Sequence, residues 1–295
     1  MLAVPIAASL ASCERAARAS QPALARDFAN DAALFVGAGD IAWCERAGAW
    51  RSSGAARTAR LLDSIPGTVF TVGDHAYVSG TPQEFAGCYA PTWGRQRART
   101  RPALGNHDHG TPNAAGYFAY FGDRAPGAWY AYDVGAWRAI ALDSWSAIFQ
   151  PLDGERQLAW LREELAAHPR RCTVAYFHHP LFTSDDRGGN EGVRALWDVI
   201  DSAGVDLVVN GHDHFYERFP PRHADGAVDQ ARGIRQFIVG TGGAPLSRPA
   251  RRAPHSERLL REHGLLALAL GEGEYRWRFL RASGDVADEG SGRCH

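Results

Sequence analysis

The sequence predicts an α/β protein whose two β-sheets pack face to face and are flanked by helices. Short apolar runs rich in β-branched residues recur in both halves of the chain, and stretches with helical periodicity lie between them. Several of these runs end in glycine followed by aspartate or asparagine, which is typical of strands that stop at a ligand-binding edge. The 295 residues contain no internal repeat or low-complexity linker, so we expect one domain over residues 31–295.

Three predicted strands in the first part of the chain are each followed by an oxygen-bearing side chain. They cover residues 33–38, 68–72 and 103–104, and they end at Gly39-Asp40, Gly73-Asp74 and Gly105-Asn106. Glycine tolerates positive φ and the close approach of a second backbone, which lets the next side chain project beyond the strand. An aromatic hairpin is predicted over residues 129–133 and 137–143, and a helix capped by Asp153 runs to about Ala167.

Histidines follow two predicted strands in the second part of the chain. The strand over residues 173–177 ends in His178-His179-Pro180, and an apolar run ending in Asn210-Gly211 leads into His212-Asp213-His214. A helix over residues 193–202, ended by Gly204, lies between them, and the closing strands are predicted at 236–239, 265–270 and 275–280. A His-x-His motif alone is compatible with metal ligands or with loop histidines satisfied by hydrogen bonds.

Nitrogen and oxygen donors thus accumulate at the ends of several strands. The candidate metal ligands are Asp40, Asp74, Tyr77, Asn106, His178, His212 and His214. This set is too large for one zinc ion, and it suits two ions about 3.5–4 Å apart that share one bridging carboxylate.

At these positions the sequence resembles the calcineurin-like metallophosphoesterases, in particular the purple acid phosphatases and their bacterial single-domain relatives. The blocks that carry the resemblance occur in the same order: Gly39-Asp40, then Gly73-Asp74-x-x-Tyr77, Gly105-Asn106-His107-Asp108, His178-x-Pro180, and Gly211-His212-x-His214-x-Tyr216-Glu217-Arg218. A looser similarity extends from about residue 33 to the end of the chain. The resemblance implies the four-layer metallophosphoesterase fold.

The resemblance also implies a role for each donor. Asp40, Tyr77 and His214 would bind the first ion, Asn106, His178 and His212 the second, and Asp74 would bridge them. In the wider superfamily a histidine ligand follows the first aspartate by two positions, and this chain has Ala42 there. The purple branch replaces that histidine by a tyrosine three positions after the bridging aspartate, which is Tyr77 in this chain. A phenolate favours Fe³⁺ at this site, with Fe²⁺, Zn²⁺ or Mn²⁺ at the second. The alternative for Tyr77 is a loop aromatic that packs on the core.

The resemblance identifies His107 as the residue that contacts the phosphoryl group or the leaving oxygen. His107 directly follows the ligand Asn106, so it cannot easily bind the same ion. Its neighbour Asp108 is the second catalytic candidate, either orienting His107 or capping the following turn. Three further histidines adjoin motif residues, and we expect them to support the site or lie on the surface: His75, His109 and His179.

Three other features bear on how substrate is bound. Many purple phosphatases place another histidine beyond the His-x-Pro block, but residues 181–189 contain none, so leaving-group protonation would fall to His107 or to water. Arg218 is expected to hold a carboxylate such as Glu217 rather than phosphate. The arginine- and proline-containing run from Arg248 to Arg252 is either a solvated loop or an edge of the cleft that attracts anions.

Composition limits the functional class. The formal net charge is −1, which gives no general attraction to nucleic acid or to anionic membranes. All 32 basic residues are arginines, and the absence of lysine excludes a P-loop and a Schiff-base mechanism. No segment is long enough to span a bilayer.

The apolar start of the chain and the cysteines point to export. Residues 1–30 are interpreted as a leader and tail, and Leu10-Ala11-Ser12-Cys13 resembles a lipoprotein processing site with a lipid anchor at Cys13; a misassigned start is the alternative. The remaining four cysteines fit two disulfides of an oxidising compartment, with Cys44 paired to Cys88 and Cys172 to Cys294. Four buried thiols are the alternative to these disulfides.

The sequence therefore predicts an exported hydrolase of small phosphate monoesters. The two ions would lower the pKa of a bound water, align the resulting hydroxide for in-line attack at phosphorus and neutralise the developing charge. A phosphodiesterase or nucleotidase on the same metal core is the first rival. A catalytically silent protein that binds metal or phosphate is the second, although binding metal alone would not require His107.

Overall fold

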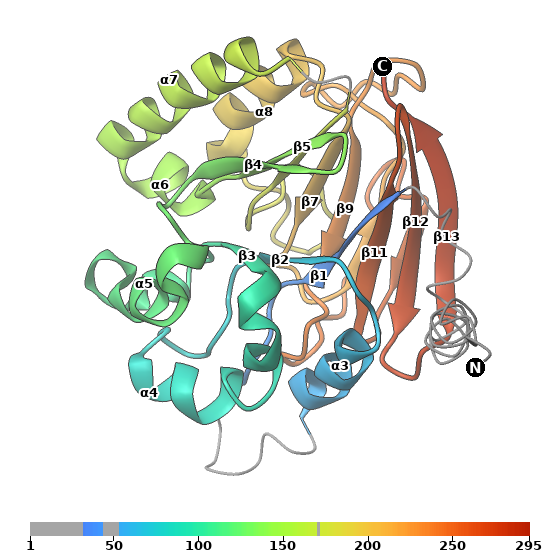
Figure 1. Ribbon diagram of the computed structural model, residues 1–295. Coiled ribbons are helices and arrows are strands. Elements are labelled where there is room, and N and C mark those ends of the chain that lie inside the picture. Colours follow the sequence, from blue (N-terminus) through green and yellow to red (C-terminus); the bar gives the residue numbers. More distant parts are fainter. Residues whose placement is uncertain (1–31, 44–52, 170–171) are drawn as a thin grey trace, which may run out of the picture.

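The computed structural model describes residues 32–43, 53–169 and 172–295, which form two mixed β-sheets packed face to face (Figure 1). The first sheet has the order β13-β12-β11-β1-β2-β3. Its strands are β1 (Ala33–Ala38), β2 (Thr68–Val72), β3 (Thr100–Ala103), β11 (Gly264–Leu270), β12 (Glu274–Arg281) and β13 (Val286–Arg293). Neighbours among β1, β2 and β3 pair in parallel, while β11, β12 and β13 extend this sheet in antiparallel fashion.

The second sheet has the order β10-β8-β9-β7-β6-β5-β4. Its strands are β4 (Tyr130–Val134), β5 (Trp137–Ala141), β6 (Thr173–Tyr176), β7 (Leu207–Asn210), β8 (Tyr216–Arg218), β9 (Arg235–Val239) and β10 (Arg258–Leu260). Neighbours among β5, β6, β7 and β9 pair in parallel. The carboxyl ends of these strands therefore lie at one edge of this sheet, where the polar loops begin.

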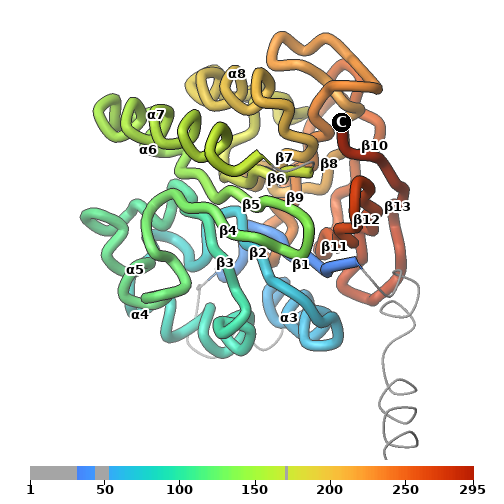
Figure 2. The backbone as a smooth tube through the Cα atoms, turned by 45° about the horizontal axis from the view of Figure 1, so that its top comes forward, coloured from blue at the N-terminus to red at the C-terminus, as the bar shows by residue number. Residues whose placement is uncertain are grey.

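Helices cover the outer face of each sheet. In Figure 2, α7 and α8 lie above the second sheet, and α3, α4 and α5 lie below the first. The helices are α3 (Gly54–Asp63), α4 (Pro82–Glu84), α5 (Ala115–Phe121), α6 (Ser144–Phe149), α7 (Pro151–Ala167) and α8 (Arg194–Ser202). Aromatic side chains join the sheets between these layers, where the rings of Phe35 in β1 and Tyr176 in β6 have centroids 5.8 Å apart. The predicted pair of packed sheets flanked by helices is thus confirmed.

Most predicted elements lie within a residue or two of the observed ones, and the exceptions have local causes. The third strand starts at Thr100 and ends at Ala103, so the expected strand at 103–104 was placed too late. It contains Pro102, which an edge strand tolerates because only one side of the strand has to pair. The helix expected to be capped by Asp153 begins earlier, at Pro151, since proline suits the first helical turn.

Three strands were not predicted from the sequence: β8, β10 and β13. The longest of them is β13, Val286–Arg293, which lacks the alternation of apolar and polar residues that marks a half-buried strand. Its Gly290 and Gly292 lie under the rings of Trp277 and Tyr275, where an added Cβ would come within 2.2 and 2.3 Å of ring atoms. Packing against β12, rather than its own side chains, therefore explains why this segment is a strand.

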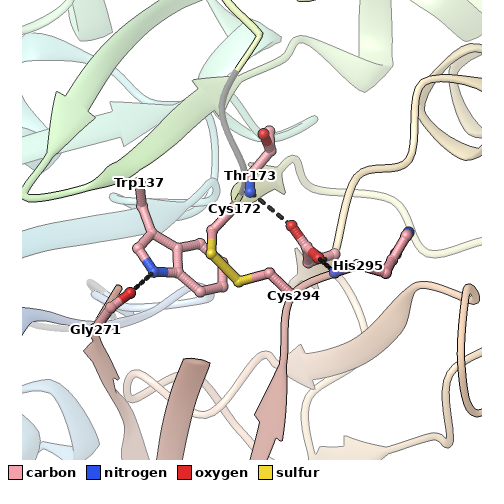
Figure 3. The surroundings of a disulfide bond; sticks show 7 residues. Trp137, Cys172, Thr173, Gly271, Cys294 and His295 are labelled. Atoms are coloured by element: carbon pink, nitrogen blue, oxygen red, sulfur yellow. Dashed lines mark hydrogen bonds and ion pairs between the residues drawn. A yellow bond between two sulfur atoms is a disulfide. The ribbon is translucent and has the colours of Figure 1, made fainter. Parts of the chain in front are cut away.

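A disulfide joins the two sheets (Figure 3). It lies before β6, at the end of that strand opposite the polar loop. Cys172 precedes β6 and Cys294 follows β13, with 5.3 Å between their Cα atoms, as predicted. Beside it, the Asp206 carboxylate accepts hydrogen bonds from the backbone N–H groups of Thr173 (2.7 Å) and His295 (3.0 Å). The other expected disulfide partner, Cys44, lies outside the described residues, as do Cys13 and the proposed leader. No described helix is long and apolar enough to cross a membrane.

Candidate metal centre

The backbone at the strand ends is held in conformations that aim the donor side chains into one space. Asp40, Asp74 and His212 have φ values of 58°, 55° and 68°, in the left-handed region that is uncommon outside glycine, although aspartate and histidine adopt it more often than most residues. Residues in such conformations persist where the surroundings enforce them, and they cluster at functional sites. Here each of the three directly follows a glycine after β1, β2 or β7.

Two glycines show why the motif needs residues without a side chain. Gly73 has a φ of 89°, and a Cβ there would come within 2.7 Å of His178 Nδ1. Gly105 has no positive φ, but a Cβ there would lie 2.2 Å from Asp74 Oδ1. The first glycine thus supplies conformational freedom together with space, and the second supplies space alone.

The first group of donors meets around the phenol of Tyr77. Its hydroxyl oxygen lies 2.9 Å from Asp40 Oδ1 and 3.1 Å from His214 Nε2, and those two atoms are 3.1 Å apart. All three side chains are buried or largely buried. Burial, with the nearby charges of Asp40 and Asp74, raises the pKa of Tyr77 well above its ordinary value. A phenolate at this position would therefore need a cation beside it.

The second group consists of Asn106, His178 and His212. Asn106 Oδ1 lies 3.0 Å from His178 Nε2 and 3.1 Å from His212 Nδ1, and the two ring nitrogens are 3.2 Å apart. Burial together with the charge of His178 lowers the pKa of His212 to about 4, so its ring is neutral at pH 7 and offers a lone pair. Three atoms that could each bind a metal ion therefore converge.

Asp74 lies between the two groups. Its Oδ2 atom is 3.0 Å from the Tyr77 hydroxyl and 3.4 Å from His178 Nε2. Burial disfavours the carboxylate, but the charge and hydrogen bond of His178 outweigh burial and hold the pKa of Asp74 well below its usual range. In turn, although burial opposes the imidazolium, Asp74 raises the pKa of His178 to about 10. The ion pair thus neutralises a buried carboxylate.

Backbone carbonyls fix the orientation of two of the histidines. His178 Nδ1 lies 2.7 Å from the carbonyl oxygen of Val72, and His214 Nδ1 lies 2.7 Å from that of Pro245. A proton held on Nδ1 by a carbonyl leaves Nε2 as the atom that can bind a metal, which is the usual arrangement of metal-binding histidines. The donor chemistry therefore fits metal ions. Two sets of three side chains lie close enough together to hold one: the first is Asp40, Asp74 and His178, and the second is His178, His179 and His212.

His107 lies beside the donors and remains accessible. Its backbone N–H donates to Asp74 Oδ1 at 2.9 Å, its Nδ1 lies 2.5 Å from the carbonyl oxygen of Val78, and its Nε2 is 3.8 Å from Asp74 Oδ2. The side chain is 31% exposed, which leaves Nε2 within reach of a bound ligand.

Asp108 faces the backbone instead of the cleft. Its carboxylate is fully buried and accepts hydrogen bonds from the N–H groups of Asp74 (2.9 Å), His75 (3.2 Å) and Gly105 (2.9 Å). It also lies 2.9 Å from His75 Nδ1. These contacts tie the loops after β2 and β3 together and hold Asp74 in its left-handed conformation.

Two histidines next to the motif residues have partners that the sequence analysis did not identify. His109 Nε2 lies 3.1 Å from Asp143 Oδ2, and His179 Nδ1 lies 2.9 Å from Ser144 Oγ. Burial and the neighbouring histidines His178 and His212 lower the pKa of His179 to about 2, so it stays neutral. Asp143 follows the end of β5, so the strand-end rule applied to the other strands could have found it.

The two arginine features occupy different positions. Arg218 Nε donates to Asp288 at 2.8 Å, and its guanidinium also pairs with Glu257; Glu217 instead accepts from the Ser184 N–H at 2.8 Å. Arg218 thus holds carboxylates, as expected, but they are those of Asp288 and Glu257 and not that of Glu217. The reason is that β8 pairs between β9 and β10, which directs the two side chains to different partners. Arg251 and Arg252 line a cavity with Ser184 and Asp185 that includes none of the seven donors.

Comparison with known proteins assigns this arrangement to a family. The model of the calcineurin-like phosphoesterases matches residues 33–216, the segment that contains all seven donors. The chain belongs to the calcineurin-like phosphoesterase family. The resemblance noted in the sequence is thereby confirmed.

Relatives of this phosphoesterase by sequence include purple acid phosphatases. An uncharacterized protein of Mycobacterium tuberculosis is 31% identical over 183 residues, 48% of this chain and 35% of that protein. Probable purple acid phosphatase 20 of Arabidopsis thaliana is 32% identical over 155 residues, again 48% of this chain and 35% of that protein. The chain thus spans about a third of the length of these relatives.

Solved structures share the fold of this phosphoesterase. Purple acid phosphatase PPD1 from yellow lupin (Lupinus luteus) has a TM-score of 0.68 at 20% identity, covering 89% of this chain and 54% of that one. GAP50, the anchor in the inner membrane complex of Plasmodium, has a TM-score of 0.72 at 15% identity and 89% coverage of both chains. Because the same fold occurs in a phosphatase and in an anchor, function has to be argued from the donor side chains.

Proposed function

We propose that this chain hydrolyses phosphate monoesters with two adjacent metal ions. The observation that carries the proposal is the position of Asp74 Oδ2, 3.0 Å from the Tyr77 hydroxyl and 3.4 Å from His178 Nε2. One carboxylate oxygen in contact with both donor groups supports a shared ligand between two ions. Asp40, Tyr77 and His214 would hold the first ion, and Asn106, His178 and His212 the second.

The donor types support different ions at the two positions. Tyr77 and Asp40 offer hard oxygen atoms that suit Fe³⁺, whereas two imidazoles and an amide oxygen suit Fe²⁺, Zn²⁺ or Mn²⁺. When bound, the pair of ions would supply an activated water and neutralise charge on the phosphoryl group.

The chain's own residues would handle the leaving group and the geometry. The Val78 carbonyl holds a proton on Nδ1 of His107, so Nε2 is the atom that gains or gives up a proton. His107 would therefore protonate the departing oxygen from Nε2 or hold a phosphoryl oxygen there. Asp108 would act as a positioning residue, because its hydrogen bonds fix Asp74 and the loop that carries His107.

The test is turnover of a monoester and a diester by the same purified protein, together with elemental analysis. With iron available during expression, we expect close to two metal ions per chain, at least one of them iron, and faster hydrolysis of p-nitrophenyl phosphate than of its bis ester. Faster diester hydrolysis would favour the phosphodiesterase or nucleotidase. Two ions without turnover of either ester would favour the silent binding protein, and a single zinc ion would contradict the binuclear centre.

Tyr77 provides a separate test of iron. A phenolate bound to Fe³⁺ absorbs visible light by charge transfer, so the oxidised protein should be pink to violet. Tyr77→Phe should remove this band while circular dichroism shows an unchanged fold. A variant that keeps its colour, or a colourless wild type with iron confirmed in the site, would contradict this assignment.

Export is part of the proposal. The Cys172–Cys294 disulfide supports an oxidising compartment, where such bonds persist. Fractionation of cells that express the full chain, followed by mass spectrometry of the mature N-terminus, would test for cleavage and for a lipid at Cys13. Recovery of the uncleaved chain in the cytoplasm would contradict export.

A further inference from the structure

The loop after Pro180 brings an arginine to the cavity beside the donor set. A cavity of about 410 Å³ is lined by Arg187 and Asn190 from this loop and by His212 and Asp213 from the loop after β7. His212 is one of the seven proposed metal ligands, so this cavity borders the donor set at His212. Among the described residues that line this cavity, Arg187 alone carries a guanidinium.

Two carboxylates hold Arg187 on one side. Its Nε donates to Asp185 Oδ1 at 2.7 Å, and its Nη2 lies 3.3 Å from Asp213 Oδ1. Asp185 Oδ1 also accepts the backbone N–H of Arg187 at 3.0 Å, and Asp213 is itself fixed by the Thr183 hydroxyl at 2.6 Å. The guanidinium is thus oriented before any substrate arrives, which reduces the entropy that binding has to overcome.

The other side of the guanidinium is available. The Arg187 side chain is 66% exposed, and its Nη1 has no hydrogen bond within the described part of the chain. An arginine cannot give up its proton at physiological pH, so it would contribute charge and directed hydrogen bonds instead of acid catalysis. Residues 181–189 contain no histidine, so Arg187 is the cationic side chain that this loop offers to the cleft.

Resting on the proposed function, we propose that Arg187 binds a non-bridging oxygen of the phosphoryl group and thereby selects dianionic monoesters over monoanionic diesters. A monoester carries one more negative charge than a diester near neutral pH. It also presents one more terminal oxygen. A fixed guanidinium beside the donors therefore stabilises the monoester more strongly.

The variant Arg187→Gln tests this selection. A charge-assisted hydrogen bond contributes about 1.5–3 kcal/mol, so kcat/KM for a monoester should fall about 10-fold to 150-fold. The diester should lose less than about 3-fold, because it lacks the extra charge. Arg187→Lys keeps the charge but not the planar fork, so it should recover part of the loss. The matched control is Arg156→Gln, which removes an exposed arginine from α7 that pairs with Asp153.

A binding measurement separates this inference from the proposed function. Titration calorimetry of the metal-loaded protein with inorganic phosphate should show weaker binding to Arg187→Gln than to Arg156→Gln, with equal metal content and thermal midpoint. Equal losses on both esters, phosphate binding equal to that of the control, or loss of metal would each overturn the role of Arg187. A wild type that hydrolyses neither ester but binds phosphate through Arg187 would overturn the proposed activity and leave the anion contact supported.

Discussion

The two ends of strand β6 differ in what their polar groups do. At the carboxyl end, His178 meets Asp74 and Asn106, and three donor residues nearby have left-handed backbone conformations. At the amino end, the Thr173 N–H donates to Asp206 next to the Cys172–Cys294 disulfide (Figure 3). The first end gathers charge and strained backbone, and the second joins the two sheets. This difference indicates that contacts at the amino end stabilise the fold, while the strained backbone and buried charges at the carboxyl end reduce its stability when no ions are bound.

The largest effect is expected from Asp74→Asn. Removing the shared carboxylate should release metal and with it the activated water and the charge neutralisation, a combined loss of at least about 10⁴-fold in kcat/KM. The thermal midpoint of the metal-free protein should also fall, because Asp74→Asn leaves the buried imidazolium of His178 without its carboxylate partner. Elemental analysis, kinetics and calorimetry measure the three quantities. The control is Asp63→Asn, which changes an exposed aspartate at the end of α3. An Asp74→Asn protein that keeps both ions would contradict the bridging role.

His107→Ala should show a smaller loss without loss of metal. A positioned acid contributes about 10²–10⁴-fold, and the loss should lie near the upper end because residues 181–189 offer no second histidine. Alkyl phosphates should suffer more than aryl phosphates, whose leaving groups need little protonation.

The control for His107→Ala is His223→Ala, which removes a histidine that pairs with Asp201 and Asp229. Equal losses on alkyl and aryl esters would point to stabilisation of phosphoryl charge alone. Loss of an ion would place His107 among the metal ligands.

At the other end of β6, the double change Cys172→Ser with Cys294→Ser should reduce stability without affecting the site. The bond closes a loop with a sequence separation of 122 residues, and constraining such a loop in the unfolded chain is worth about 5 kcal/mol. Denaturant unfolding measures the loss, while metal content and kcat at 25 °C should match the wild type. A variant of unchanged stability, or one that loses metal, would show that the two ends are not separable in this way.

The smallest effect concerns the pH dependence of stability at Asp206. Burial raises the pKa of this carboxyl to about 6, although the backbone N–H groups of Thr173 and His295 oppose the shift. Because the pKa of Asp206 is higher in the folded than in the unfolded protein, its contribution to the free energy of unfolding is fully present below about pH 4. That contribution is lost as the pH rises to about 6.

Asp206→Asn should remove that dependence, which amounts to about 3 kcal/mol. Denaturant unfolding of wild type and variant at pH 4 and pH 7 measures it. The wild type should lose more stability than the variant between these pH values, and parallel curves would contradict the shifted pKa.

The sequence by itself determined the donors and the strands that carry them. Gly73-Asp74 and Asn210-Gly211-His212 follow apolar runs directly, so the position of each side chain at a strand end is a property of adjacent residues. The Cys172–Cys294 pair was also predicted, because only a few cysteines had to be matched. The strand-end side chains depend only on adjacent residues, and the disulfide depends on the small number of cysteines. Both can therefore be predicted from one sequence.

Only the tertiary structure decided which groups surround those donors. The carbonyl oxygens of Val72 and Pro245 that orient His178 and His214 belong to distant segments and have no sequence signature. The same holds for Asp213, which lies 26 positions from Arg187 along the chain and fixes its guanidinium. Strand β13 exists because Gly290 and Gly292 leave room for rings of β12. Such contacts depend on how segments pack in space, and a residue's neighbours along the chain do not report them.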